Sequence, residues 1–146
     1  MFVIFFLILF SYNFSKAQNI DVSQNHSSLE IVPYDSIYAF DDHFYFGVKV
    51  KLEKGWKTYW KNPGEAGAPL TIDWENDEEI LNKEILFPFP KKYIDHGVET
   101  IGYENEIIFP IKLKLKKDTK VVNSKLILQY LVCKEVCIPI TTEKKN

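Results

Sequence analysis

The sequence predicts an all-β domain built as a β-sandwich, and two observations support that prediction. First, apolar and polar residues alternate in HFYFGVKVKLE (His43–Glu53) and in FPIKLKLKK (Phe109–Lys117). A period of two is typical of strands that have one buried face and one face in water. Second, glycine, proline and asparagine residues divide the chain into short apolar segments, which is the turn pattern of a sandwich. We therefore expect two packed sheets of short strands.

The remaining elements follow from the same patterns. Lys125–Cys133 is more continuously apolar than the two alternating segments, so we expect both faces of this strand to be covered. Only Asp77–Lys83 is expected to form one or two helical turns. Weaker strand candidates complete the sandwich, and these are Leu29–Pro33, Ser36–Phe40, Leu70–Trp74 and Glu84–Phe87.

The amino-terminal segment predicts export from the cytoplasm. Phe2–Phe10 is an uninterrupted apolar run, but it is shorter than the roughly 20 residues that a transmembrane helix needs. Ser15 and Ala17 are small residues at the positions that a signal peptidase recognises. We expect a signal peptide at 1–17, a flexible segment at 18–28, the sandwich domain at 29–142 and a polar tail at 143–146, with no stable membrane span after signal removal.

The composition argues against nucleic acid as a partner. All 18 basic residues are lysines, and with 20 acidic residues the formal net charge is −2. Bidentate recognition of phosphate or guanine favours arginine, which this chain lacks. In addition, the basic clusters contain no more than two adjacent lysines.

Cys133 and Cys137 are the main candidate functional residues, and three interpretations compete. As a structural staple, a bridge that closes about five residues would stabilise the fold by only about 2 kcal/mol. As a metal clamp, the two thiolates supply half of a tetrahedral zinc site, and only His26, His43 and His96 could complete it. As a redox couple, the pair would sit at a hairpin tip, where a partner's sulfur can reach it. The residues alone leave the staple and the couple equally weighted.

Four segments, in this order, carry a resemblance to a known family: GWKTYWKNPGEAGAPLTIDW (Gly55–Trp74), FPFPKKY (Phe87–Tyr93), GYENEIIFPIKL (Gly102–Leu113) and YLVCKEVCIP (Tyr130–Pro139). Together they resemble the N-terminal periplasmic domain of the DsbD/ScsB family of protein-disulfide reductases. The resemblance covers roughly Ser28–Thr142. It implies an immunoglobulin-like fold, a periplasmic location, and thiol–disulfide oxidoreductase activity that requires no bound cofactor.

The resemblance also implies roles for single residues and for partners. Cys133 and Cys137 match the family's redox pair, with Cys137 forming the mixed disulfide and Cys133 resolving it. The domain would take electrons from a membrane donor through a thioredoxin-like domain, and pass them to disulfides of thioredoxin-like periplasmic proteins. An aromatic side chain caps the active site in DsbD, and the candidates for it here are Phe44, Tyr59 and Trp60, although aromatic residues of a sandwich more often belong to the core.

The chain departs from the family pattern in two ways. Three residues separate the cysteines, as in ScsB-like sequences, whereas DsbD itself has a longer spacing. Family members usually continue into a membrane domain and a thioredoxin-like domain, so we expect a separate electron donor or a stand-alone or fragmentary member. Copper tolerance, isomerase upkeep and cytochrome maturation stay open as its task. The alternative function is a non-catalytic binding or assembly module with a structural Cys133–Cys137 disulfide.

Overall fold

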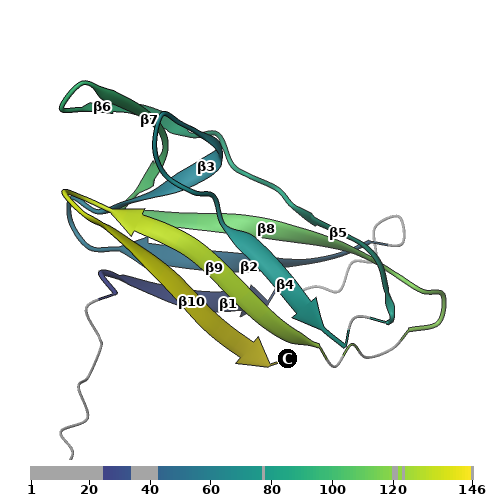
Figure 1. Cartoon of the computed structure of the whole chain (residues 1–146). Helices are drawn as coiled ribbons and strands as arrows, with labels where there is room; N and C mark the ends of the chain where they lie inside the picture. The colour runs from purple at the N-terminus through teal and green to yellow at the C-terminus, as the bar shows by residue number, and fades with distance from the viewer. Residues whose placement is uncertain (1–24, 34–42, 77, 120–121, 123, 146) are drawn as a thin grey trace, which may run out of the picture.

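The computed structural model describes residues 25–33, 43–76, 78–119, 122 and 124–145. All regular secondary structure in these residues is β-strand, and the strands form two sheets that pack as a sandwich (Figure 1). The predicted all-β sandwich is therefore confirmed. The expected signal peptide at 1–17 and the expected strand at Ser36–Phe40 lie outside the described residues.

One sheet has four antiparallel strands in the order β1 (Ser27–Pro33), β2 (His43–Leu52), β8 (Glu106–Leu115) and β5 (Ile80–Ile85). Its alternating sequences place one face in the core. Val48 and Val50 of β2 are completely buried, whereas Lys49 between them forms an ion pair with Glu30 at 2.8 Å. The period-two prediction therefore identified both the strands and their buried faces.

The other sheet has six strands and follows the order β10 (Cys137–Lys145), β9 (Lys125–Cys133), β3 (Lys57–Gly64), β7 (Val98–Glu104) and β6 (Lys91–Asp95). The sixth strand, β4 (Thr71–Glu75), also pairs with β9, at the end of β9 that lies away from β3. This sheet carries the two cysteines.

The hydrophobic core lies between the sheets. Phe109 of β8 is fully buried, and its ring meets the rings of Phe87 and Tyr103 edge-on, with centroids 5.6 and 5.3 Å apart. Leu128 and Val132 of β9 approach from the opposite sheet and are also fully buried. Burial of such side chains stabilises the fold by about 1.5–3 kcal/mol each, so the core holds the sheets together without help from the disulfide.

The expected helical turns at Asp77–Lys83 are wrong. Strand β5 begins at Ile80 and pairs with β8, and the Lys116 amide donates a hydrogen bond to the Glu79 carbonyl at 2.9 Å. The free edge of β8 offers a row of backbone partners, and pairing with it outweighs the weak helical preference of this segment.

Two further expectations about β9 and β10 are corrected. Both faces of β9 were expected to be covered, but Gln129 is exposed and its face is only partly buried. The polar tail expected at 143–146 is part of the sandwich as far as Lys145, because Glu143–Lys145 continue the β10 ladder opposite β9. Lys125 and Glu143 face each other across that ladder and form an ion pair at 3.2 Å.

Candidate functional site

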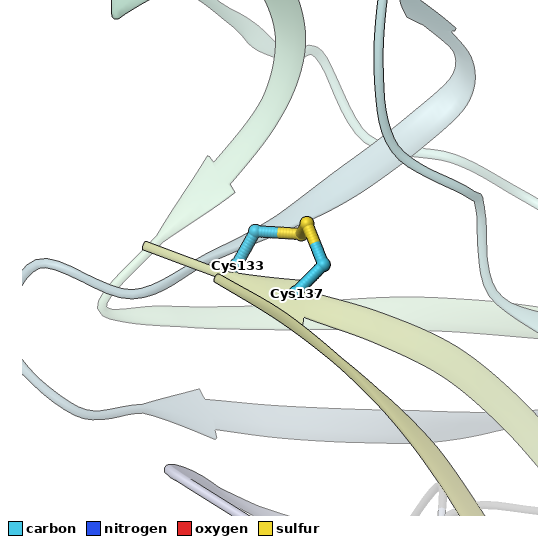
Figure 2. Close-up of a disulfide and its surroundings, with 2 residues drawn as sticks. All are labelled: Cys133 and Cys137. Atoms are coloured by element: carbon cyan, nitrogen blue, oxygen red, sulfur yellow. A yellow bond between two sulfur atoms is a disulfide. The ribbon is translucent and has the colours of Figure 1, made fainter. Parts of the chain in front are cut away.

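The two cysteines form a disulfide at the tip of the β9–β10 hairpin (Figure 2). Strand β9 ends at Cys133, β10 begins at Cys137, and the two residues are direct partners in the antiparallel ladder. Their Cα atoms are 4.1 Å apart, close to the roughly 4.5 Å of a non-hydrogen-bonded pair. The Lys134 amide donates to the Val136 carbonyl at 3.0 Å within the turn. The predicted hairpin-tip position is therefore confirmed.

The two sulfur-bearing residues differ strongly in exposure. Cys133 is 5% exposed, whereas Cys137 is exposed at the surface. Val136, which precedes Cys137, is a 64% exposed apolar side chain at the apex of the turn. A molecule that approaches the tip therefore meets Cys137 and Val136 before it meets Cys133.

The disulfide lies on the face of the sheet that points away from the core. Val132 points into the core, and because side chains alternate along a strand, Cys133 points to the outer face. Lys57 of β3 is the direct partner of Cys133, and Glu104 of β7 is the direct partner of Lys57. Paired residues share a face, so Cys137, Cys133, Lys57 and Glu104 form one row across the outer face.

The β6–β7 hairpin reaches back to this row. Asp95, at the end of β6, forms an ion pair with Lys57, whose ammonium group also lies 4.6 Å from the centre of the Tyr93 ring. Lys91 of the same strand forms an ion pair with Glu104 at 3.1 Å. The hairpin and the cysteine tip lie at the same end of the molecule (Figure 1). Because of these contacts, the side chain of Lys57 is only 17% exposed.

Three tyrosines near this end have raised pKa values. Burial raises the pKa of Tyr59, and the Asp95 carboxylate raises it further. Burial also raises the pKa of Tyr93, and the carboxylates of Glu104 and Asp95 add to the effect. On the core side, burial raises the pKa of Tyr103 to about 12, and its hydroxyl donates to the Pro88 carbonyl at 2.8 Å. All three side chains are therefore neutral at physiological pH.

The structure separates the three candidates for an aromatic cap. Phe44 belongs to the other sheet, at the end of β2 opposite the β2–β3 turn, and Trp60 packs against the core. Tyr59 shares the outer face with Lys57, but it is buried, and a Cβ on Gly67 would lie only 2.4 Å from its ring. Tyr93 also shares this face and was not anticipated from the sequence. These placements favour Tyr59 and Tyr93 over the other two.

The sequence did not predict the contacts of Lys57 with Cys133, Asp95 and Tyr93, because these contacts depend on pairing between distant strands. The alternation in KTYW places Lys57 and Tyr59 on one face, but nothing local shows that Cys133 is the partner of Lys57. Likewise, Tyr93 and Asp95 stand in a short strand with two leading lysines and little apolar periodicity. A register between distant strands would have been needed to find them.

The histidines considered as metal ligands lie in other settings. His26 stacks on Trp56, with ring centroids 4.0 Å apart, and its Nδ1 lies 2.7 Å from Glu53 Oε2. His43 begins β2 and His96 lies in the β6–β7 turn. Across the ranges that the structure describes, no group of three or more His, Cys, Asp or Glu side chains is placed to hold a metal ion.

Comparison with protein families gives a direct match. A sequence profile for the family described as "Thiol:disulfide interchange protein DsbD, N-terminal" matches residues 28–146. The chain belongs to this family. The resemblance of this DsbD N-terminal domain to the DsbD/ScsB family is therefore confirmed. No curated protein sequence matches the chain.

Solved structures of DsbD and ScsB domains have the same fold. The N-terminal periplasmic domain of ScsB from Proteus mirabilis is 27% identical with a TM-score of 0.65, and the match covers 83% of this chain and 46% of that one. The chain thus spans less than half the length of that ScsB structure. The reduced DsbD N-terminal domain of Neisseria meningitidis is 17% identical with a TM-score of 0.53, and the match covers 83% of this chain and 84% of that one.

A third structure is the complex between the DsbD N-terminal and PilB N-terminal domains of Neisseria meningitidis. It is 16% identical with a TM-score of 0.50, and the match covers 82% of this chain and 80% of that one. The expected immunoglobulin-like fold is confirmed by this group of neighbours.

Among the residues that the structure describes, none forms a helix of the length and apolarity that crossing a membrane requires.

Proposed function

We propose that this DsbD N-terminal domain is a periplasmic thiol–disulfide exchange domain that uses Cys133 and Cys137 as its dithiol–disulfide couple. It receives electrons from a membrane or thioredoxin-like donor and passes them to disulfides of thioredoxin-like periplasmic proteins. The observation that carries the proposal is the asymmetric disulfide at the hairpin tip, in which an exposed Cys137 is bonded to a buried Cys133. Exchange requires one approachable sulfur and one resolving sulfur, and this pair provides both.

The reaction proceeds in two displacements. In the reduced domain, the Cys137 thiolate attacks one sulfur of the partner disulfide, and the partner's other sulfur leaves as a thiolate. The Cys133 thiolate then attacks the Cys137 sulfur, closes the Cys133–Cys137 bond and releases the partner's second thiolate. The partner gains two electrons and takes up protons at its two sulfurs. A donor dithiol restores the reduced domain by the same steps in reverse.

The comparisons support the location and the kind of partner. The Proteus mirabilis relative is a periplasmic domain, and the meningococcal DsbD domain has been solved in a complex with a PilB domain. A hairpin tip with one exposed apolar residue, Val136, is suited to docking against another protein surface.

Trapping of the mixed disulfide tests the assignment of the two cysteines. We expect the Cys133→Ala protein, mixed with an oxidised thioredoxin-like protein, to accumulate a covalent complex through Cys137, because the domain no longer has a second thiol to resolve it. The matched Cys137→Ala protein should form much less complex, because its remaining thiol is buried. Complexes are counted on non-reducing gels. Equal trapping by the two variants would contradict the assignment, and no trapping by either would contradict the proposed exchange.

The burial of Cys133 favours a second candidate function. A disulfide with one sulfur-bearing residue only 5% exposed also suits a non-catalytic binding or assembly module. In that case the bond would be permanent, and its reduction potential would lie below about −300 mV. The two candidates therefore differ in a single measurable quantity.

A further inference from the structure

Lys57 is the residue of β3 that pairs with the buried member of the cysteine pair. It is the ladder partner of Cys133, and both side chains leave the sheet on its outer face. Cys133 is 5% exposed, so a thiolate formed there would have little contact with water. Burial disfavours the charged form of a thiol, whereas a cation within about 4–6 Å favours it by roughly 1–3 pKa units. A nearby cation would therefore favour a thiolate at Cys133, and the residue paired with Cys133 on the neighbouring strand β3 is a lysine.

We propose that Lys57 is a positioning residue for the exchange reaction, whose ammonium group is held by Asp95 in the oxidised domain and stabilises the Cys133 thiolate when the disulfide opens. This inference rests on the proposed function of the same cysteine pair. It adds a charge partner from β3, a strand that contributes no cysteine.

The step that Lys57 assists is the reduction of the domain by its donor. A donor thiolate attacks the Cys137 sulfur, a donor–Cys137 bond forms, and the Cys133–Cys137 bond breaks. The electron pair of the broken bond leaves on Cys133 as a thiolate. A leaving thiol with a lower pKa departs faster and makes the couple easier to reduce. Lys57 would therefore raise both the rate of this step and the reduction potential.

In the oxidised domain, the Lys57 ammonium group already interacts with Asp95 and Tyr93. The Lys57 side chain is only 17% exposed, because it forms an ion pair with Asp95 and lies 4.6 Å from the Tyr93 ring centre. An opened disulfide adds a negative charge at Cys133, the ladder partner of Lys57. Asp95 and the Cys133 thiolate then compete for the Lys57 ammonium group. The redox state of the cysteine pair is thereby coupled to the Lys57–Asp95 ion pair, which attaches the β6–β7 hairpin to β3.

Other titratable or charged groups face the pair or border the Lys57 contacts. These are Tyr59 on β3, Glu104 on β7, Lys91, Tyr93 and Asp95 on β6, His96 in the β6–β7 turn, and Lys134 and Glu135 in the cysteine turn. Burial raises the pKa values of both tyrosines, so they stay neutral below pH 9. Carboxyl and lysine side chains ordinarily titrate near pH 4 and above pH 10. His96 is the one histidine among these groups, so the test below also removes it.

The test is the equilibrium between the domain and glutathione at pH 5, 7 and 9. We expect Lys57→Gln to match the wild-type protein at pH 5, where the thiols are protonated in both. At pH 9 its equilibrium constant for reduction should be about tenfold lower, which corresponds to a potential about 30 mV more negative. Lys92→Gln is the matched control, because it removes one lysine charge from an exposed ion pair with Glu99, and it should follow the wild-type protein at every pH.

A second variant separates the charge effect from a loosened hairpin. Asp95→Asn also removes the Lys57–Asp95 ion pair, but it leaves the Lys57 charge free for the thiolate. We expect its couple to be easier to reduce at pH 9 than that of the wild-type protein, opposite in sign to Lys57→Gln. Lys57→Arg should restore most of the wild-type behaviour. All variants are then measured again in a background that carries His96→Asn, which removes the histidine of the β6–β7 turn. Asparagine tolerates the positive φ of 52° found at this position.

Each outcome decides one of the two proposals. A Lys57→Gln potential that equals the wild-type value at all pH values, or differs by the same amount at all of them, overturns the role of Lys57. A shift of Asp95→Asn in the same direction as Lys57→Gln overturns it too, because a loosened hairpin would then explain both. If glutathione cannot reduce even the wild-type disulfide, the proposed exchange function itself fails.

Discussion

Cys133 and Cys137 are bonded to each other, yet their surroundings assign them different chemistry. Cys137 is exposed at the tip, whereas Cys133 is buried beside a lysine from the neighbouring strand. An exposed sulfur can be attacked or can attack, and a buried one next to a cation can leave or resolve. The proposed division of labour therefore depends on where β9 and β10 place the two residues, although both border the same turn.

Gly67 and Gly97 allow a matched test of the packing on the disulfide face. Both have positive φ, at 105° and 84°, so an alanine at either is strained by roughly 1–2 kcal/mol. A Cβ at Gly67 would also lie 2.4 Å from the Tyr59 ring, whereas a Cβ at Gly97 meets nothing within 4 Å. We expect Gly67→Ala to lose about 1–3 kcal/mol more of the free energy of unfolding in urea titrations. Equal losses would contradict this packing.

Tyr103 makes the free energy of unfolding depend on pH in the alkaline range. Its pKa rises from 10.0 to about 12 on folding, so the unfolded chain loses this proton first. The stabilisation is fully present below about pH 10 and is lost as the pH rises through about 12. We expect a flatter decline of the unfolding free energy across this range in Tyr103→Phe than in the wild-type protein. Parallel declines in the two proteins would show that Tyr103 does not titrate in this way.

The sequence predicted the cysteine pair but not its charged neighbours. Two cysteines separated by three residues, at the end of a strong strand, indicate a hairpin tip, because that information is local. Lys57 and Asp95 come from other strands, and they join the site through strand pairing and an ion pair between side chains far apart in the sequence. Among eighteen lysines, nothing in the sequence distinguishes Lys57.

At the scale of elements, the β9–β10 hairpin should stay folded when its disulfide is absent. The loop that the bond closes is short, so its loss costs only about 2 kcal/mol on the loop-entropy formula. The ladder from Lys125 to Cys133 and the buried face of β9 remain. We expect the Cys133→Ala, Cys137→Ala double variant to keep the wild-type circular dichroism spectrum and to unfold cooperatively. An unfolded double variant would indicate that the bond is a staple.

Strands were predictable where one face is buried and the other is charged. β2 shows that alternation from Val48 to Leu52 and β8 shows it from Ile111 to Leu115, and both strands were found. β6 has two lysines and an aspartate in five residues, and its place in the sheet depends on pairing with β7. β10 ends in polar residues that are held by the ladder rather than by burial. Hydrophobic periodicity in a sequence reflects the burial of one strand face. It therefore does not identify strands that are held mainly by backbone pairing.

At the scale of the whole molecule, the sandwich holds the disulfide and its charged neighbours at one end. The core between the sheets does not involve the disulfide, which lies on the outer face of the six-stranded sheet. Three structural units meet there: the β9–β10 tip, the Lys57 end of β3 and the β6–β7 hairpin. In the proposed function, this separation of core and site would let the disulfide open and close without unfolding the domain.

The measurement that tests the central claim most directly is the reduction potential of the Cys133–Cys137 couple in the wild-type protein. The protein is equilibrated with defined thiol buffers at pH 7, and the fraction of reduced protein is counted by alkylation. We expect a value between about −200 and −270 mV, which is the range of exchange-active couples. A value well below about −300 mV would contradict it, because the bond would then be a permanent structural disulfide.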